Sequence, residues 1–242
     1  MTPTTHATAT PRVVTLSTER WGSREIRWGE SWEHGTAAYW LEATRRSSRT
    51  AEPERHRLTD SLFDEVALCM LGGFGMPYEL GLAAFVALRE QLLQHDPVPT
   101  ESAIEAVLTQ PLRVGGSTRR YRFPHQRAQR LSQALTHLHE SPVPTAPLEV
   151  REWLTSAPGI GPKTASWIVR NRWPDAPVAI LDVHVLRAGI GAGVFPDGTR
   201  VESSYRQLEA WFVAWADAED VRPSDLDATI WAEEAFRARH RG

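Results

Sequence analysis

Apolar residues recur at intervals of three and four positions along most of this chain, which is the spacing of one face of an α-helix. The first such run, from Phe63 to Met70, predicts a helix that begins near Thr59 or Asp60. Three further helices are predicted with both bounds, at residues 100–108, 162–172 and 182–192. Two more are predicted to end near residues 93 and 157, two to begin at residues 124 and 223, and one to include residues 205–215. The chain is therefore predicted to be mostly α-helical.

The first 50 residues follow other patterns. Apolar and polar residues alternate from Val13 to Trp28 around a Gly-Ser turn, which predicts a short β-hairpin or an extended segment. Trp32, Tyr39 and Trp40 come next and are expected in a helix that ends near Arg46. Aromatic side chains can stack on nucleic-acid bases, although they more often form a core.

These patterns divide the chain into parts. Residues 1–11 are rich in Thr, Ala and Pro and are expected to be disordered, and residues 45–54 read as a polar linker. Residues 12–50 are expected to form an aromatic-rich segment that packs on the main domain, residues 51–242.

Lys163 is the only lysine among the 242 residues, so the other 26 of the 27 basic residues are arginines. Arginine supplies charge and hydrogen bonds, but it does not lose its proton and cannot act as a nucleophile. A single side-chain amine in such a chain indicates chemistry at this position, although a solvated surface lysine is the more common arrangement.

Lys163 lies in a helix-hairpin-helix pattern at residues 148–172. Ala157-Pro158 ends one helix, Gly159-Ile160-Gly161 forms a turn in which glycine permits a positive φ, and Pro162 opens a second helix. The backbone N–H groups at the start of that second helix form an anion site that suits a nucleic-acid phosphate. The pattern therefore predicts a unit that binds a nucleic-acid backbone.

Asp182 follows Lys163 by nineteen residues and closes the apolar run of residues 178–181. Its position directly before another helical run predicts an N-cap. An aspartate at an N-cap is usually only a cap, so this residue by itself does not indicate catalysis.

The segments PGIGPKTA, residues 158–165, and LDVH, residues 181–184, together resemble the helix-hairpin-helix DNA glycosylases of the HhH-GPD superfamily, and most of all the 8-oxoguanine DNA glycosylase/AP lyases. The resemblance implies a mostly α, two-lobed helical fold. It implies that Lys163 is the nucleophile of the bifunctional members, that Asp182 is the catalytic aspartate, and that His184 contacts a phosphate beside the lesion. The DNA-binding residues expected here are Gly159, Ile160, Gly161, His184 and Arg187.

The implied activity is that of a bifunctional DNA glycosylase and AP lyase in base excision repair. Relatives with this lysine that act on oxidised pyrimidines usually carry a four-cysteine iron–sulfur cluster, whereas this chain has one cysteine, Cys69. We therefore expect no cluster and no other cofactor, and excision of 8-oxoguanine from double-stranded DNA. Two alternatives stay open: a glycosylase for another modified base, such as an oxidised pyrimidine or a modification carried by foreign DNA, and a non-enzymatic module that only binds DNA.

Other candidate contacts come from a basic run and from analogy. Seven basic residues between Arg113 and Arg130 form the densest positive patch in a chain of net charge −3, and Arg119 and Arg120 are expected to bind phosphates unless the patch is only a solvated face. Relatives fill the gap left by the flipped base with Asn or Gln, which the region 72–77 lacks. The candidate wedge residues are instead Phe74 and Met76. The candidate base-pocket residues are Asp227, Trp231 and Phe236, for which a place in the core is the alternative.

The remaining expectations concern metals, membranes and assembly. No side-chain metal site is expected, although the hairpin carbonyls are expected to hold a monovalent cation as in relatives. The N-terminus lacks a signal peptide and no apolar run is long enough to span a bilayer. We expect a monomer in the cytoplasm, associated with the nucleoid.

Overall fold

The computed structural model describes residues 12–50, 59–73, 75–95 and 98–240. The chain divides into two compact units. The central unit is residues 55–176, and the terminal unit combines residues 1–54 with residues 177–242. The described part of the chain is mostly α-helical, as predicted, with two short β-hairpins.

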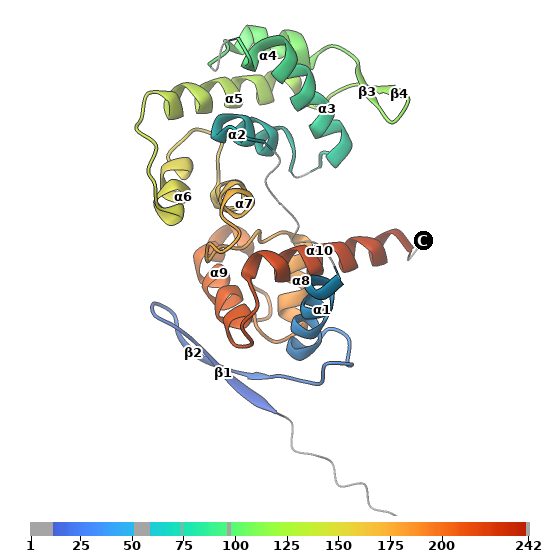
Figure 1. Cartoon of the computed structure of the whole chain (residues 1–242), viewed down its shortest axis with the longest axis vertical. Helices are drawn as coiled ribbons and strands as arrows, with labels where there is room; N and C mark the ends of the chain where they lie inside the picture. The colour runs from blue at the N-terminus through green and yellow to red at the C-terminus, as the bar shows by residue number, and fades with distance from the viewer. Residues whose placement is uncertain (1–11, 51–58, 74, 96–97, 241–242) are drawn as a thin grey trace, which may run out of the picture. The chain divides into compact units, whose positions relative to one another are not determined.

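The central unit is built around one buried helix. Its elements are α2 (Leu62–Leu71), α3 (Tyr78–Leu88), the π-helical turn η1 (Arg89–Leu93), α4 (Glu101–Leu108), β3 (Leu112–Val114), β4 (Ser117–Arg119), α5 (Pro124–His139), α6 (Pro147–Thr155) and α7 (Pro162–Arg172). Helix α2 contacts α3, α5 and α7, and each of its residues from 65 to 71 is buried. Helices α6 and α7 lie side by side and form the predicted helical hairpin (Figure 1).

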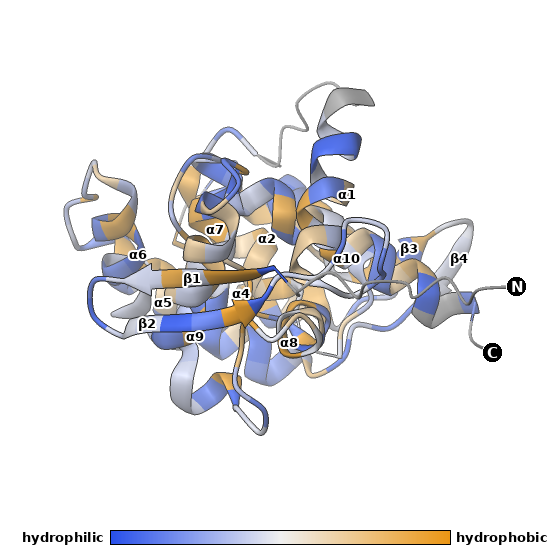
Figure 2. Ribbon diagram, turned by 90° about the horizontal axis from the view of Figure 1, so that it is seen from below, coloured by the Kyte–Doolittle hydropathy of each residue, from blue (hydrophilic) through white to orange (hydrophobic). Residues whose placement is uncertain are grey.

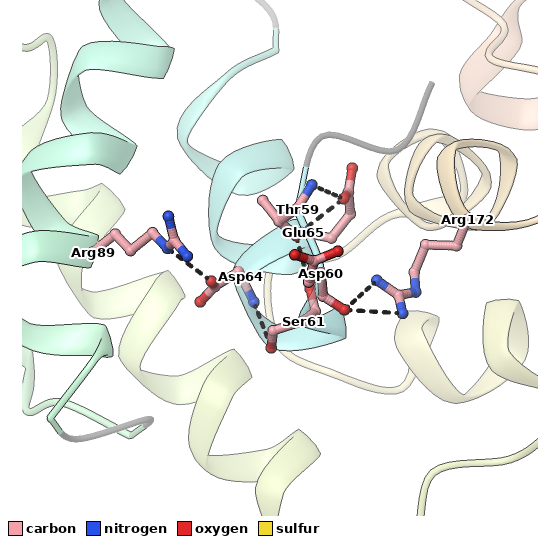
Figure 3. Close-up of polar contacts among 7 residues, drawn as sticks. All are labelled: Thr59, Asp60, Ser61, Asp64, Glu65, Arg89 and Arg172. Atoms are coloured by element: carbon pink, nitrogen blue, oxygen red, sulfur yellow. Dashed lines mark hydrogen bonds and ion pairs between the residues drawn. The ribbon is translucent and has the colours of Figure 1, made fainter. Parts of the chain in front are cut away.

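The start of α2 is fixed by a group of polar contacts. The N-cap is Ser61, whose hydroxyl accepts a hydrogen bond from Asp64 N, so the helix begins slightly later than the sequence predicted. The buried carboxylate of Glu65 accepts hydrogen bonds from Thr59 N and from Asn171 Nδ2 of α7. Arg172, the last residue of α7, donates to the Asp60 carbonyl (Figure 3). These bonds tie the end of α7, and therefore the hairpin, to α2.

The terminal unit joins the two ends of the chain. Its elements are β1 (Val13–Thr18), β2 (Gly22–Arg27), α1 (Ala37–Thr50), α8 (Val183–Gly191), α9 (Val201–Asp217) and α10 (Pro223–His240). The two strands are antiparallel, as the alternating pattern predicted, and β1 shows a long hydrophobic stretch whereas β2 is mostly hydrophilic (Figure 2). Helix α10 contacts α1, α8 and α9.

The N-terminal aromatic residues divide between core and surface: Trp32 lies before α1, outside the expected helix, and is 78% exposed. Trp28 and Trp40 are almost fully buried in one cluster with Trp215 and Phe212. Trp215 Nε1 also donates to the Ala37 carbonyl at 3.3 Å. The base-stacking interpretation therefore does not apply to Trp40.

The structure corrects the expected linker at residues 45–54. Helix α1 continues through the polar residues to Thr50, and an exposed ion pair between Arg46 and Glu42, one turn apart, adds a small stabilisation. The hydroxyl of Ser48 also bonds to the carbonyl of Thr44. Residues 51–54 and the tail at 1–11 lie outside the described residues.

Candidate active site

Lys163 occupies the first turn of α7, in the central unit. Gly161 is the N-cap of this helix and Pro162 is its first residue, so Lys163 is the second. Ala165 N donates to the Gly161 carbonyl at 3.0 Å, which begins the helical ladder and leaves the earlier amides without helical partners. The half-buried Lys163 side chain is thus placed beside free backbone donors, as the sequence predicted.

The two glycines of the hairpin turn have different physical roles. Gly159 has a φ of +81°, and a Cβ built on it would lie 3.1 Å from Cβ of Arg130 on α5. Gly161 has a φ of −88°, which any residue adopts, and a Cβ there would meet no atom within 4 Å. Gly159 is therefore required by the turn itself, whereas the fold does not require glycine at 161. Ile160, between them, is buried.

Asp182, in the terminal unit, is the N-cap of α8, as predicted. Its Oδ1 atom accepts hydrogen bonds from His184 N at 2.8 Å and from Val185 N at 2.9 Å. The other carboxylate oxygen, Oδ2, has no hydrogen-bond partner within the described ranges. One oxygen thus fixes the side chain, and the second is available to face a positive charge.

His184 and Arg187 lie on the same helix as the cap. The Nδ1 atom of His184 is shielded from solvent and unpaired within the part of the chain that the structure describes, while the rest of the ring is partly exposed. Arg187 is exposed, with a long 3.5 Å contact from Nη1 to Glu234 on α10. Their expected phosphate contacts stay predictions.

Six of the seven basic residues of the patch separate into two groups, and the seventh, Arg130, is exposed on α5 beside Gly159. Arg127 donates to the Met70 carbonyl and Arg122 to the Gly75 carbonyl, and both therefore bind the backbone at or beyond the end of α2. Tyr121 helps them by donating to the Leu71 carbonyl, and burial raises the pKa of Tyr121 to about 12. His125 contacts Glu105 on α4 at 2.7 Å.

The second group is free to meet a ligand. Arg113, Arg119 and Arg120 lie on or next to the β3–β4 hairpin, whose Gly115-Gly116 turn the sequence did not identify as a hairpin. All three are exposed, and none has an ion-pair partner among the described residues. These three side chains are therefore free to contact phosphate, whereas Arg122 and Arg127 use part of their hydrogen-bonding capacity on backbone carbonyls.

The candidate wedge and base-pocket residues differ in how exposed they are. Phe74 lies outside the described residues, and Met76 is half-buried in the loop before α3. Trp231 and Phe236 are exposed on α10, at 50% and 57%, so neither is a core residue. Asp227 differs from expectation, because it is only 3% exposed and its Oδ2 accepts a hydrogen bond from Ile180 N. Its carboxylate binds the backbone in the interior of the terminal unit, which agrees with the alternative of a place in the core.

The described residues include no group suited to a metal ion and no helix suited to crossing a bilayer. Across the described ranges, no three His, Cys, Asp or Glu side chains are grouped so that they could hold a metal ion. Each described helix is too short or too polar to span a bilayer. Cys69 is buried in α2, and desolvation and the nearby Glu65 carboxylate raise its pKa well above the usual value.

Solved structures of DNA glycosylases are similar in fold to this chain. The 8-oxoguanine DNA glycosylase of Thermotoga maritima is 25% identical, with 81% of this chain and 86% of that chain covered and a TM-score of 0.54. The Methanocaldococcus jannaschii 8-oxoguanine glycosylase/lyase, in complex with DNA containing 8-oxoguanine, is 20% identical, with 83% and 89% covered and a TM-score of 0.55. A trapped endonuclease III–DNA covalent intermediate is 15% identical, with 80% and 82% covered and a TM-score of 0.56. The search of curated proteins found no match.

The family model for 8-oxoguanine DNA glycosylase (Ogg-HhH) matches residues 45–220, which is well over half of the chain. The match includes the hairpin with Lys163 and the cap residue Asp182, and it confirms the resemblance inferred from their two segments. The chain belongs to the 8-oxoguanine DNA glycosylase family of the HhH-GPD superfamily.

Proposed function

We propose that this protein is a bifunctional DNA glycosylase that removes 8-oxoguanine from DNA and then cleaves the strand through a Schiff base on Lys163. The observation that carries the proposal is the position of the only lysine in the chain, in the first turn of the second hairpin helix. Membership of the family supports the glycosylase activity, and the amine supports the lyase step.

Base excision uses the two candidate catalytic residues in different ways. The target nucleotide leaves the base stack so that its sugar can be reached. As the N-glycosidic bond breaks, its electron pair leaves with the base, and the Asp182 carboxylate stabilises the positive charge that develops on the sugar. Nζ of Lys163 then forms the new bond to C1′.

Strand cleavage follows from this covalent bond. Loss of a proton from Nζ and opening of the sugar ring give a Schiff base between Lys163 and C1′. Removal of a C2′ proton then breaks the C3′–O bond, and the 3′ phosphate leaves with that electron pair. Water hydrolyses the Schiff base and regenerates the amine, so the reaction uses no redox cofactor and no iron–sulfur cluster.

The DNA backbone is held by two features of the central unit. Free amides at the start of α7 bind a phosphate of the strand under repair, and a monovalent cation at the hairpin carbonyls is part of the same proposal. The exposed Arg119 and Arg120 add a salt-dependent contribution. A single chain supplies each of these groups, and we propose that a monomer acts in the cytoplasm on nucleoid DNA.

A panel of duplexes, each with one lesion, tests the substrate. The proposal expects excision and strand cleavage at 8-oxoguanine, with little cleavage of the matched undamaged duplex. Strong cleavage at an oxidised pyrimidine and none at 8-oxoguanine would move the substrate to another modified base. Binding without cleavage of any duplex would favour a module that only binds DNA.

A further inference from the structure

The four residues before Asp182 form a buried segment that belongs to no helix or strand. Val178, Ala179, Ile180 and Leu181 are all buried. Buried backbone N–H and C=O groups need hydrogen-bond partners, and an irregular segment cannot take them from its own secondary structure. The partners of this segment therefore have to come from groups outside it.

Two helices of the terminal unit supply these partners. From α9, Glu209 Oε1 accepts a hydrogen bond from Ala179 N at 3.2 Å, and the hydroxyl of Tyr205, one turn earlier, donates to the Ala179 carbonyl at 2.6 Å. From α10, Asp227 Oδ2 accepts a hydrogen bond from Ile180 N at 3.2 Å. Two consecutive backbone amides thus bind two carboxylates from different helices.

The burial of these carboxylates shows that they do more than fill space. Glu209 is 4% exposed and Asp227 is 3% exposed. A buried carboxylate is costly unless it is hydrogen-bonded, and an apolar side chain would fill the same volume without that cost. The carboxylates give the Ala179 and Ile180 backbone a defined position, which an apolar residue would not. The second oxygen of Glu209 also lies 3.8 Å from Nη1 of Arg206 on the same helix.

That position is transmitted directly to Asp182. Asp182 N donates to the Ile180 carbonyl at 2.8 Å, so the residue anchored by Asp227 also bonds to the backbone of Asp182. The amides of α8 fix the Asp182 side chain from the other direction. The carboxylate is therefore held on both sides, by the segment before it and by the helix after it.

We infer that Glu209, Asp227 and Tyr205 are positioning residues for the Asp182 carboxylate in base excision, an inference that rests on the proposed function. A catalytic group that moves by about 1 Å can lose about a hundredfold in rate. Loss of either carboxylate frees the segment on one side and leaves a buried amide unpaired. Base excision then slows, whereas nicking of a preformed abasic site, in which no base has to leave, does not.

The experiment measures these two reactions separately. Single-turnover excision of 8-oxoguanine and nicking of a preformed abasic site are compared for the wild type, Glu209→Ala and Glu209→Gln, with rates expressed per active molecule from borohydride trapping. Glu209→Ala should lower excision at least tenfold and change nicking less than threefold. Glu209→Gln keeps an acceptor oxygen for Ala179 N, and should restore excision to within about threefold of the wild type. Asp227→Ala and Asp227→Asn should behave in the same way.

Phe212→Leu is the control for a general loss of stability. Phe212 lies on α9 in the same core, and its ring contacts Trp215. This variant should unfold at a lower temperature while keeping the wild-type ratio of excision to nicking. If Glu209→Ala does not fold, Tyr205→Phe replaces it, because it removes only the hydroxyl that bonds to Ala179, and it should lower the same ratio.

Three results would overturn the inference while the proposed function stands. The first is an unchanged ratio of excision to nicking in Glu209→Ala and Asp227→Ala. The second is a change of this ratio in Phe212→Leu as large as the change in Glu209→Ala. The third is no recovery of excision in Glu209→Gln and Asp227→Asn. A wild-type chain that neither excises 8-oxoguanine nor nicks abasic sites would overturn the proposed function, and this inference with it.

Discussion

Replacing Asp182 with asparagine separates its structural role from its proposed chemical role. The Oδ1 atom accepts two backbone hydrogen bonds, from His184 N at 2.8 Å and Val185 N at 2.9 Å. Asparagine keeps an oxygen in this position and is as good an N-cap as aspartate. The substitution removes only the interaction of the charge with the helix dipole, so the free energy of unfolding should fall by less than about 1 kcal/mol.

The rate of base excision should fall far more than stability does. Asp182 Oδ2, which has no partner in the described part of the chain, is the atom that we assign to the developing positive charge. Loss of one preorganised electrostatic contact in an enzyme costs about 2.7–4 kcal/mol in the transition state, or about 10²–10³ in rate. For this one variant, single-turnover excision of 8-oxoguanine measures the rate, urea unfolding measures the stability, and a binding titration measures the DNA affinity.

Asp182→Ala provides the comparison, because it removes the cap as well as the charge. Loss of an N-cap typically costs about 1 kcal/mol, so this variant should be less stable than Asp182→Asn and equally slow in excision. The reasoning would be refuted if Asp182→Asn excised the base within tenfold of the wild-type rate. It would also be refuted if, in both variants, the excision rate fell only in proportion to the loss of stability.

Three further predictions concern the hairpin, the basic patch and the N-terminal segment. Gly161→Ala should fold normally, because its φ of −88° and open surroundings accept a Cβ, but it should bind DNA more weakly in a fluorescence titration. Gly159→Ala should instead lower the melting temperature, because residue 159 has a φ of +81°. Equal DNA affinity of Gly161→Ala and the wild type would mean that the DNA backbone does not approach Gly161. Neutralising Arg119 and Arg120 together should weaken binding to all sequences and flatten its salt dependence, and an unchanged slope would mark a solvated surface. In the N-terminal segment, Arg12 and Arg45 donate hydrogen bonds to the Glu219 carboxylate. Burial alone raises the pKa of Glu219, but these hydrogen bonds outweigh it and leave this pKa below its usual value. A lowered pKa stabilises the fold above the unfolded value of about 4.3, and this contribution is lost as the pH falls through the folded value, so Glu219→Gln should be less stable than the wild type at pH 7 and not at pH 2.

Local sequence signals were sufficient for the hairpin and for the cap. The glycines, Pro162 and the apolar spacing act over a few residues, so they predicted the turn, the start of α7 and the position of Lys163 in its first turn. Asp182 was equally well placed as the N-cap of α8, because a cap depends on the two or three residues that follow it.

Contacts between residues distant in sequence could not be predicted in the same way. Glu209 bonds to a backbone amide 30 positions earlier, and Asp227 to one 47 positions earlier, and nothing in the sequence around α9 or α10 indicates these partners. Asp227 was therefore assigned to the base pocket. Arg127, one of the seven basic residues between Arg113 and Arg130, was counted in the positive patch for the same reason, although it binds the Met70 carbonyl, 57 positions away.

The central claim is that the Lys163 amine forms the covalent bond to DNA, and borohydride trapping tests it most directly. Wild-type protein incubated with an 8-oxoguanine duplex and borohydride should give a stable protein–DNA adduct on a denaturing gel. Lys163→Gln should give none, and neither should Lys163→Arg, which keeps the positive charge but cannot act as a nucleophile. An adduct of wild-type yield in Lys163→Gln would contradict the account and assign the nucleophile to another amine, such as the N-terminus.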